Sequence, residues 1–284
     1  MRTGINLLLW TGHVTEEHRP LLEDLRQIGY ELVEVPVMTG TVEHYAEVGR
    51  WLDDLGMGRT TSMAFTDPAA DPSSANPACR AAAKAQMAWQ IDCAQALGAT
   101  KVIGPMFQTL GQRTGHGPTE AELAAAAEVL ANAAERARVA GITLAIEALN
   151  RFECHLCNTL AAAQALADRV DHPALGIMVD TFHAHIEEKD SAAAILATGS
   201  MIRHVHLSEN DRGTPGTGQV DFPAVLTALR QVGYEGDLVI EAFGRAVPEL
   251  AAATCVWRDL APSGHELALT AWNFCQSLSR QSRP

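Results

Sequence analysis

The chain of 284 residues is 47% hydrophobic and 19% charged, which excludes a disordered protein and allows a sizeable core in one large α/β barrel or two smaller domains. Its net charge of −13 at pH 7 would repel the phosphates of a nucleic acid, so we expect no nucleic-acid partner. The N-terminal apolar run is too short for a signal peptide or a spanning helix, so we expect a cytoplasmic protein without a membrane partner.

Strand-like and helix-like segments alternate along the whole chain. Short apolar runs predict strands, while capping residues such as Thr41 and the box formed by Thr119 and Glu122 predict helix starts. Glycines such as Gly98 predict helix ends. The predicted strands are 3–9, 31–37, 59–64, 101–104, 142–146, 175–179, 201–205 and 237–240. The predicted helices are about 16–28, 42–55, about 78–97, 119–140, from 158 or 159 to before 173, from 190 or 191 to before 199, 222–232 and about 266–278.

This alternation predicts the fold. Eight strand–helix units, each roughly 35 residues long, are typical of a (β/α)8 TIM barrel, so we expect one TIM-barrel domain over residues 1–284. A doubly wound open sheet is the structural alternative. It would need a nucleotide-binding fingerprint, and no G-x-G-x-x-G follows the first strand.

Four successive strands end in a residue that can bind a metal. These are Glu147, Asp180, His206 and Glu241, which are 33, 26 and 35 residues apart, about one strand–helix unit each time. The carboxyl ends of the strands meet at one mouth of such a barrel, so we expect the four side chains to converge there. Glu34 also lies in a strand, but no matching ligand is close to it in sequence, so we interpret it as structural.

Three carboxylates and one imidazole form a hard, oxygen-rich ligand set. It suits Mn²⁺, Mg²⁺ or Co²⁺ in octahedral geometry better than structural zinc. Any one such carboxylate could instead form a salt bridge, but few basic residues lie near these four in sequence. Two open metal positions could be filled by adjacent oxygens of a polyol, and the metal would then polarise a carbonyl while a neighbouring C–H loses its proton.

Two other motifs have a functional and a structural interpretation. Cys154 and Cys157 have the spacing of a zinc or redox site, but no second closely spaced cysteine pair exists, so we expect partly buried loop thiols. The glycine-rich stretch 213–218 follows the seventh strand, where barrels often bind phosphate. It has one arginine and no lysine beside it, so we expect a turn-forming loop and a substrate without phosphate.

Four segments resemble the signature segments of the D-tagatose 3-epimerase family. This family includes D-allulose (D-psicose) and L-ribulose 3-epimerases and belongs to the xylose-isomerase-like barrels. The segments are EALNRFE (147–153), VDTFHAHIEE (179–188), HVHLSENDRGTPGTG (204–218) and IEAF (240–243). The resemblance covers essentially the whole chain in order and length.

The resemblance implies a role for each residue that matches the family. Glu147, Asp180, His206 and Glu241 would bind a divalent metal, Mn²⁺ first and Co²⁺ or Mg²⁺ as alternatives, and Glu147 and Glu241 would also be the two acid–base groups. Glu153, His183 and Arg212 would bind the substrate. The family also implies a homodimer or homotetramer. Asp211, before Arg212, departs from the family pattern and leaves the preferred sugar open, and Trp257 and Arg258 match a pair without an assigned role.

The function implied is metal-dependent epimerisation of free 2-ketoses at carbon 3, through a cis-enediolate, as in D-tagatose/D-sorbose, D-fructose/D-allulose or L-ribulose/L-xylulose pairs. Two carboxylates on opposite sides of the substrate agree with that chemistry. An aldose–ketose isomerase, a hydroxypyruvate isomerase or an inosose dehydratase could use the same residues. A multi-metal endonuclease would need more ligands at the early strand ends and has the wrong charge. A non-catalytic sugar-binding protein is the other alternative.

Overall fold

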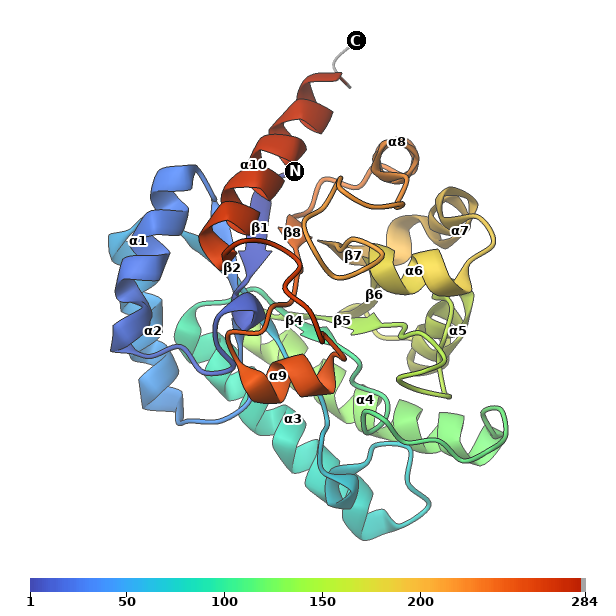
Figure 1. Cartoon of the computed structure of the whole chain (residues 1–284). Coiled ribbons are helices and arrows are strands. Elements are labelled where there is room, and N and C mark those ends of the chain that lie inside the picture. The colour runs from blue at the N-terminus through green and yellow to red at the C-terminus, as the bar shows by residue number, and fades with distance from the viewer. Residues whose placement is uncertain (282–284) are drawn as a thin grey trace.

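The computed structural model describes residues 1–281, so the last three residues of the predicted domain lie outside it. Eight parallel strands form a closed barrel in sequence order, in which β8 pairs with β1 (Figure 1). The predicted (β/α)8 barrel is confirmed. The strands are β1 Thr3–Asn6, β2 Leu32–Pro36, β3 Gly58–Ser62, β4 Lys101–Gly104, β5 Thr143–Glu147, β6 Leu175–Asp180, β7 Ile202–Leu207 and β8 Leu238–Ile240.

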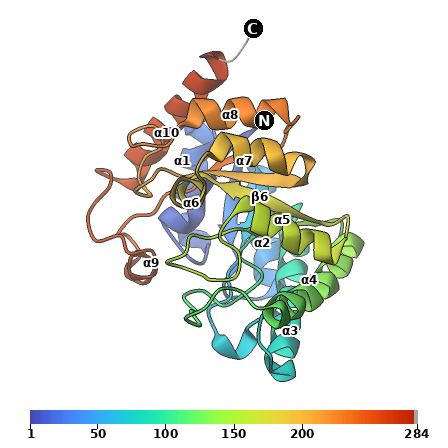
Figure 2. The ribbon, with the colours of Figure 1, turned by 90° about the vertical axis from the view of Figure 1, so that its right-hand side faces the viewer.

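Helices surround this barrel, and α10 near the C-terminus packs beside α1 (Figures 1 and 2). Within residues 1–281, no helix is long and apolar enough to cross a membrane. The helices are α1 Arg19–Ile28, α2 Val42–Asp54, α3 Pro77–Leu97, α4 Glu120–Ala140, α5 Leu160–Val170, α6 Thr181–Glu187, α7 Ser191–Thr198, α8 Phe222–Gln231, α9 Pro248–Ala253 and α10 Gly264–Gln281.

The helix boundaries follow the capping chemistry that the sequence shows. Thr41 Oγ1 accepts a hydrogen bond from the backbone N–H of His44 at the start of α2. Thr119 and Glu122 form the predicted capping box of α4. Gly98 ends α3 in the left-handed conformation that glycine adopts without strain.

The sequence analysis missed two short helices, and both lie at the mouth of the barrel. In α6, the side chain of Asp180 accepts hydrogen bonds from the backbone N–H groups of Phe182 and His183. The carboxylate that ends the strand therefore also caps a helix in a segment to which the sequence analysis assigned none. The second missed helix, α9, begins at Pro248. The predicted first strand is also too long, since Leu7–Leu9 forms a 3₁₀ turn.

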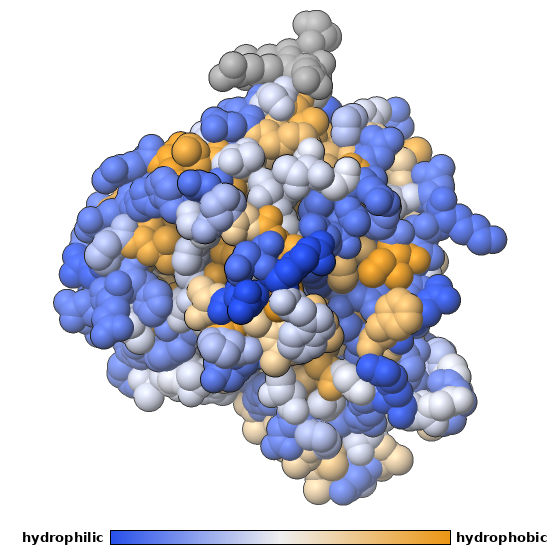
Figure 3. All heavy atoms as spheres, in the orientation of Figure 1, coloured by the Kyte–Doolittle hydropathy of each residue, from blue (hydrophilic) through white to orange (hydrophobic). Residues whose placement is uncertain are grey.

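The barrel interior changes from apolar to polar towards its carboxyl-terminal mouth. Ile103, Ala145 and Met178 form a buried apolar cluster of their own. Side chains two residues apart on a strand share a face, so Glu147 and Asp180 lie on the same interior face as Ala145 and Met178, further along their strands. On the outer surface, the view in Figure 3 shows apolar side chains separated by polar ones.

Candidate active site

Four side chains meet at the carboxyl ends of β5 to β8, as the sequence predicts. One possible ligand atom from each of Glu147, Asp180, His206 and Glu241 lies within 4.8 Å of the others. His206 Nδ1 is 3.3 Å from Glu241 Oε1 and 3.5 Å from Asp180 Oδ2. All four side chains are buried. The predicted convergence is confirmed, whereas metal ligation and acid–base catalysis by these residues stay predictions.

Strand pairing places two of these residues directly side by side. Asp180, the last residue of β6, pairs with His206 of β7. His206 pairs with Val239 of β8, two residues before Glu241. The hydroxyl of Ser208, just after β7, links the ends of β6 and β8, because its Oγ lies 3.1 Å from Asp180 Oδ2 and 2.9 Å from the Glu241 carbonyl oxygen.

Arg212 reaches this acidic cluster from the loop after β7. Its Nη1 donates to Glu241 Oε2 at 2.6 Å and to Asp180 Oδ2 at 3.2 Å. Its backbone φ is 65°, in the left-handed region that non-glycine residues rarely adopt. The guanidinium carbon lies 3.9 Å from the centre of the Phe182 ring, so the buried cation also has an aromatic face against it.

His183 and Glu153, the other two residues predicted to bind substrate, lie beside Arg212 and are held by Asn150. The backbone N–H of Asn150 donates to His183 Nδ1 at 3.0 Å, and its side-chain Nδ2 donates to Glu153 Oε1 at 2.8 Å. His183 Nε2 therefore faces the cluster, 2.9 Å from Arg212 Nη2 and 3.5 Å from Glu147 Oε1. Asn150 was not predicted as a site residue, although it is the asparagine of the E-x-x-N-R-x-E segment.

The pKa values of two carboxyl groups of the cluster are shifted in opposite directions. Burial, with the negative charges of Glu241 and Asp180, raises the pKa of Glu147 well above its ordinary value. Burial would also raise the pKa of Asp180, but the positive charge of Arg212 helps to outweigh it and the pKa of Asp180 lies well below its ordinary value. Burial and Arg212 lower the pKa of His183 to about 3, so this imidazole is neutral near pH 7. Such divergence is typical of sites that move protons.

The donor set fits a divalent metal ion. His206 Nδ1 is buried and has no hydrogen-bond partner among the described residues, although it faces carboxylate oxygens. Glu147, Asp180 and Glu241 add three hard oxygen donors. A cation between these groups would bind the free imidazole nitrogen and reduce the repulsion between the carboxylates.

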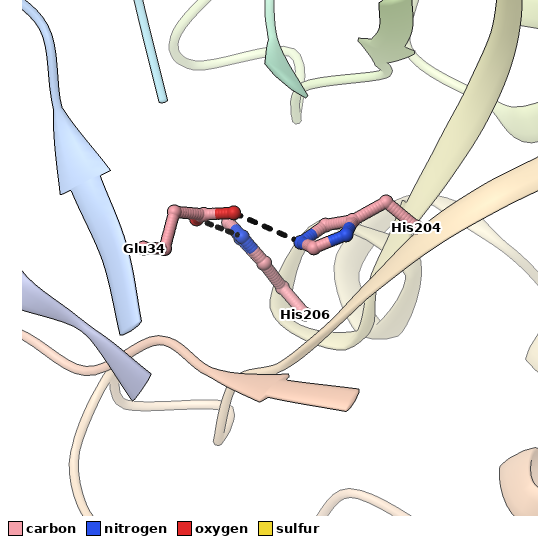
Figure 4. Close-up of side chains that lie close together, drawn as sticks. All are labelled: Glu34, His204 and His206. Carbon is pink, nitrogen blue, oxygen red and sulfur yellow. Dashed lines mark hydrogen bonds and ion pairs between the residues drawn. The ribbon is translucent and has the colours of Figure 1, made fainter. Parts of the chain in front are cut away.

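Glu34, which the sequence analysis interpreted as structural, has two histidines beside it in the fold. Figure 4 shows its carboxylate against two histidines of β7: Oε1 is 2.7 Å from His206 Nε2, and Oε2 is 2.9 Å from His204 Nε2. The sequence analysis did not find these contacts because β2 and β7 are far apart in sequence and are not paired strands. No local motif signals a contact across the barrel interior.

A cavity of about 300 Å³ opens over the cluster, a volume at the lower end of small-molecule sites. Its lining includes the predicted catalytic and substrate-binding residues. The rest of the lining is largely apolar and includes side chains from the missed helix α9. Among the lining residues are the polar Glu147, Glu153, His183, Arg212 and Glu241 and the apolar Leu8, Met38, Leu110, Phe243 and Leu250.

The two motifs with alternative interpretations lie outside the possible metal-binding clusters of residues 1–281. Cys154 and Cys157 are buried free thiols, as expected, and burial raises the pKa of Cys154 to about 11. In the glycine-rich loop, the buried Glu209 carboxylate accepts hydrogen bonds from the backbone N–H groups of Gly216, at 2.9 Å, and Gln219, at 3.0 Å. The predicted turn-forming loop is therefore organised around an internal carboxylate.

Asp211 lies outside the cluster although it precedes Arg212 in the chain. Its Oδ1 accepts a hydrogen bond from the backbone N–H of Gly213 at 2.9 Å, and its Oδ2 lies 3.4 Å from Arg258 Nη2. Its carboxylate is thus paired with Arg258 of the unassigned pair 257–258.

Comparison with known proteins identifies close relatives over nearly the whole chain. The family model of the xylose isomerase-like TIM barrel matches residues 22–261. A ketose 3-epimerase of Arthrobacter globiformis is 34% identical over 277 residues, which cover 96% of this chain and 95% of the relative. An L-ribulose 3-epimerase of Mesorhizobium japonicum is 32% identical over 281 residues, covering 96% of this chain and 92% of the relative.

Solved structures give the same result. A structure of L-ribulose 3-epimerase superimposes with a TM-score of 0.91 at 31% identity and covers 99% of this chain and 96% of the other. A structure of D-allulose 3-epimerase from Methylomonas sp. in complex with D-allulose also has a TM-score of 0.91, at 27% identity, and covers 98% of this chain and 96% of the other.

Proposed function

This chain belongs to the xylose isomerase-like TIM barrel family and, within it, to the ketose 3-epimerases, which are isomerases, and we propose that it interconverts free 2-ketoses that differ in configuration at carbon 3. The observation that carries the proposal is the position of Glu147 and Glu241, two carboxyl groups of one buried cluster that line the same cavity.

Two such groups suffice for inversion at one carbon. One carboxylate removes the proton from carbon 3, and the electron pair left behind is delocalised over carbons 2 and 3 as a cis-enediolate. The second carboxyl group then returns a proton to the opposite face of carbon 3. The protonation states of Glu147 and Glu241 are reversed at the end of the turnover, and exchange with solvent restores them.

The remaining residues of the cavity would orient the sugar. Neutral His183 and the Arg212 guanidinium present nitrogen atoms to the same space and can bind oxygens near the carbonyl. Glu153, held by Asn150, is placed to accept a hydrogen bond from a terminal hydroxyl. His183 and Arg212 are buried, which strengthens their polar contacts because little water competes for them.

We propose that a divalent metal, Mn²⁺ first and Co²⁺ or Mg²⁺ as alternatives, binds to Glu147, Asp180, His206 and Glu241. Such an ion, when bound, polarises the ketose carbonyl and stabilises the negative charge of the enediolate. A homodimer or homotetramer stays a prediction from the family resemblance, and a cytoplasmic location stays a prediction from the N-terminal sequence.

The glycine-rich loop supports a substrate without phosphate. A phosphate would need backbone N–H groups and cations there. The N–H groups of Gly216, Gln219 and Val220 already donate to the Glu209 carboxylate, the last of them at 3.0 Å. A second anion would be repelled by this carboxylate, so the loop favours a free ketose.

Turnover of a ketose in D₂O tests the proposal. We expect deuterium at carbon 3 of both epimers and no label at carbon 1, measured by NMR and mass spectrometry. Label at carbon 1 or carbon 2 with carbon 3 untouched would indicate an aldose–ketose isomerase. The absence of label at every carbon, with metal supplied, would indicate a sugar-binding protein and contradict the proposal.

A further inference from the structure

Glu34 connects β2 to the candidate metal centre through the interior of the barrel. Its strand is separated from β7 by β1 and β8, so its contact with His206 spans the barrel and is not part of strand pairing (Figure 4). Glu34, His204 and His206 are all fully buried. They lie away from bulk solvent, and each contacts at least one of the others.

Hydrogen-bond donors surround the Glu34 carboxylate. Asn6 Nδ2 donates to Oε1 at 2.9 Å, Thr60 Oγ1 donates to Oε2 at 2.8 Å, and His206 Nε2 lies 2.7 Å from Oε1. An ionised carboxylate can only accept hydrogen bonds. His206 must therefore donate to it, which places a proton on Nε2.

This hydrogen bond determines what the other ring nitrogen can do. An imidazole that binds a cation is neutral and has one N–H, so a proton on Nε2 leaves the lone pair on Nδ1. Nδ1 is the atom that faces Glu241 and Asp180 without a hydrogen-bond partner among the described residues. In the other tautomer, Nδ1 would donate to those carboxylates and could not bind a cation.

We propose that Glu34 is a positioning residue that selects the metal-binding tautomer of His206 and fixes the plane of its ring. Carboxylates that accept a hydrogen bond from a metal-binding histidine raise the basicity of the histidine and hold its ring in place. The inference rests on the proposed metal site, and it does not depend on which carbon of a sugar reacts.

Asn6 reinforces the same geometry. Its Nδ2 donates to Glu34 Oε1 at 2.9 Å and to Glu241 Oε1 at 3.2 Å, so one amide links the Glu34 carboxylate to the cluster at the mouth. Its Oδ1 accepts from the backbone N–H of Leu8 at 2.8 Å, which fixes the amide with its N–H groups towards the carboxylates.

His204 touches the same carboxylate but cannot have the same role. Its Nε2 is 2.9 Å from Glu34 Oε2, yet the contact lacks hydrogen-bond alignment, and neither ring nitrogen of His204 has a hydrogen-bond partner among residues 1–281. His204 is also not one of the four residues of the cluster at the mouth. The effect of Glu34 on the metal centre should therefore pass through His206.

Calorimetric titration of metal-free protein with Mn²⁺ tests the proposal without measuring turnover. The substitution Glu34→Gln keeps the shape of the side chain and replaces the charged acceptor with a neutral amide. We expect Mn²⁺ to bind about 10–100-fold more weakly, the usual cost of losing such a partner. Thr60→Val is the matched control: it removes another buried donor to Glu34 and leaves His206 untouched, so the affinity should change by less than about threefold.

Equal Mn²⁺ affinity of wild type and Glu34→Gln would overturn the proposal, as would an equal loss in the Thr60→Val control. If Glu34→Gln does not fold, nitrogen-15 NMR of the wild type decides: a proton on His206 Nε2 supports the proposal, and a bare Nε2 overturns it. A wild type that binds no Mn²⁺ would contradict the metal site itself. Binding of Mn²⁺ without exchange at carbon 3 would contradict only the epimerase reaction.

Discussion

The two ends of the barrel treat buried carboxylates in opposite ways. At the amino-terminal end, Asp237 accepts a hydrogen bond from Arg2 at 2.9 Å and one from Lys101 at 3.0 Å, so one anion has two cations. At the carboxyl-terminal mouth, three carboxylates lie together, and Arg212 forms ion pairs with two of them. The chain's own cations neutralise the carboxylate at the amino-terminal end, whereas the carboxylates at the mouth are arranged to bind an added cation.

The pKa shifts express this difference. Burial alone would raise the pKa of Asp237, but the hydrogen bond from Arg2 and the charge of Lys101 outweigh it and lower the pKa. For Glu147 at the mouth, burial and neighbouring carboxylates raise the pKa. The paired carboxylate at the amino-terminal end therefore stabilises the fold. The carboxylates at the mouth lower its stability and are available for binding and chemistry.

Metal removal should have the largest effect, and only at the mouth. We expect chelation to abolish epimerisation and Mn²⁺ or Co²⁺ to restore it better than Ca²⁺, whose longer bonds fit a compact octahedral site poorly. Added Mn²⁺ should also raise the free energy of unfolding, by about 2.7 kcal/mol at a hundred times its Kd. Assays and thermal unfolding check both effects, and full activity in protein shown to be metal-free by elemental analysis would contradict the prediction.

Replacing one acid–base group should have the next largest effect. Glu147→Gln and Glu241→Gln each keep an oxygen but lose the base, so kcat should fall by roughly 10²–10⁴-fold. Each variant can still exchange the carbon 3 proton of the one epimer that faces its remaining carboxyl group, which NMR in D₂O would detect. Glu153→Gln is the matched control, and it should raise KM more than it lowers kcat. An equal loss of kcat in all three variants would argue against separate roles.

Much of this site could be predicted because it lies at strand ends. Glu147, Asp180, His206 and Glu241 each directly follow an apolar run, and about one strand–helix unit separates each from the next, so alternation along the sequence fixes where they meet. Helix ends were predictable for a similar reason, since caps such as Thr119 are local.

The contacts that cross the barrel could not be predicted in this way. Glu34 contacts a residue 172 positions away, on a strand that is not its neighbour. The short helix α6 was missed because Asp180 was interpreted only as a ligand, although the same carboxylate also caps the helix that carries His183. The position of Asp180 at a strand end indicated a metal ligand, and that interpretation left its role as a helix cap unnoticed.

At the amino-terminal end, Asp237→Asn should reduce stability without changing kcat. We expect the free energy of unfolding at pH 7 to fall by roughly 1.5–3 kcal/mol, the usual contribution of hydrogen bonds to a charged group. The folded-state pKa of Asp237 lies below its ordinary value of 3.8, so its contribution is complete above that pH and is lost as the pH falls through the lowered value. Urea unfolding at several pH values checks this: the difference from wild type should shrink only in acid.

The smallest effect on activity should come from Asp211→Asn, because Asp211 is next to Arg212 in sequence but its side chain lies away from the cavity. Asp211 precedes Arg212, but the left-handed backbone at Arg212 turns its guanidinium into the barrel, while the Asp211 carboxylate lies 3.4 Å from Arg258 on the surface. The side chains of this pair are 38% and 73% exposed, so the pair should contribute less than about 1 kcal/mol. Asparagine can still accept the hydrogen bond from Gly213. We therefore expect kcat/KM for each ketose to stay within about twofold of wild type, because the charge is lost outside the cavity. A tenfold change, or a new preference between two ketoses, would show that the field of Asp211 reaches the substrate and that the mouth extends further than its buried cluster.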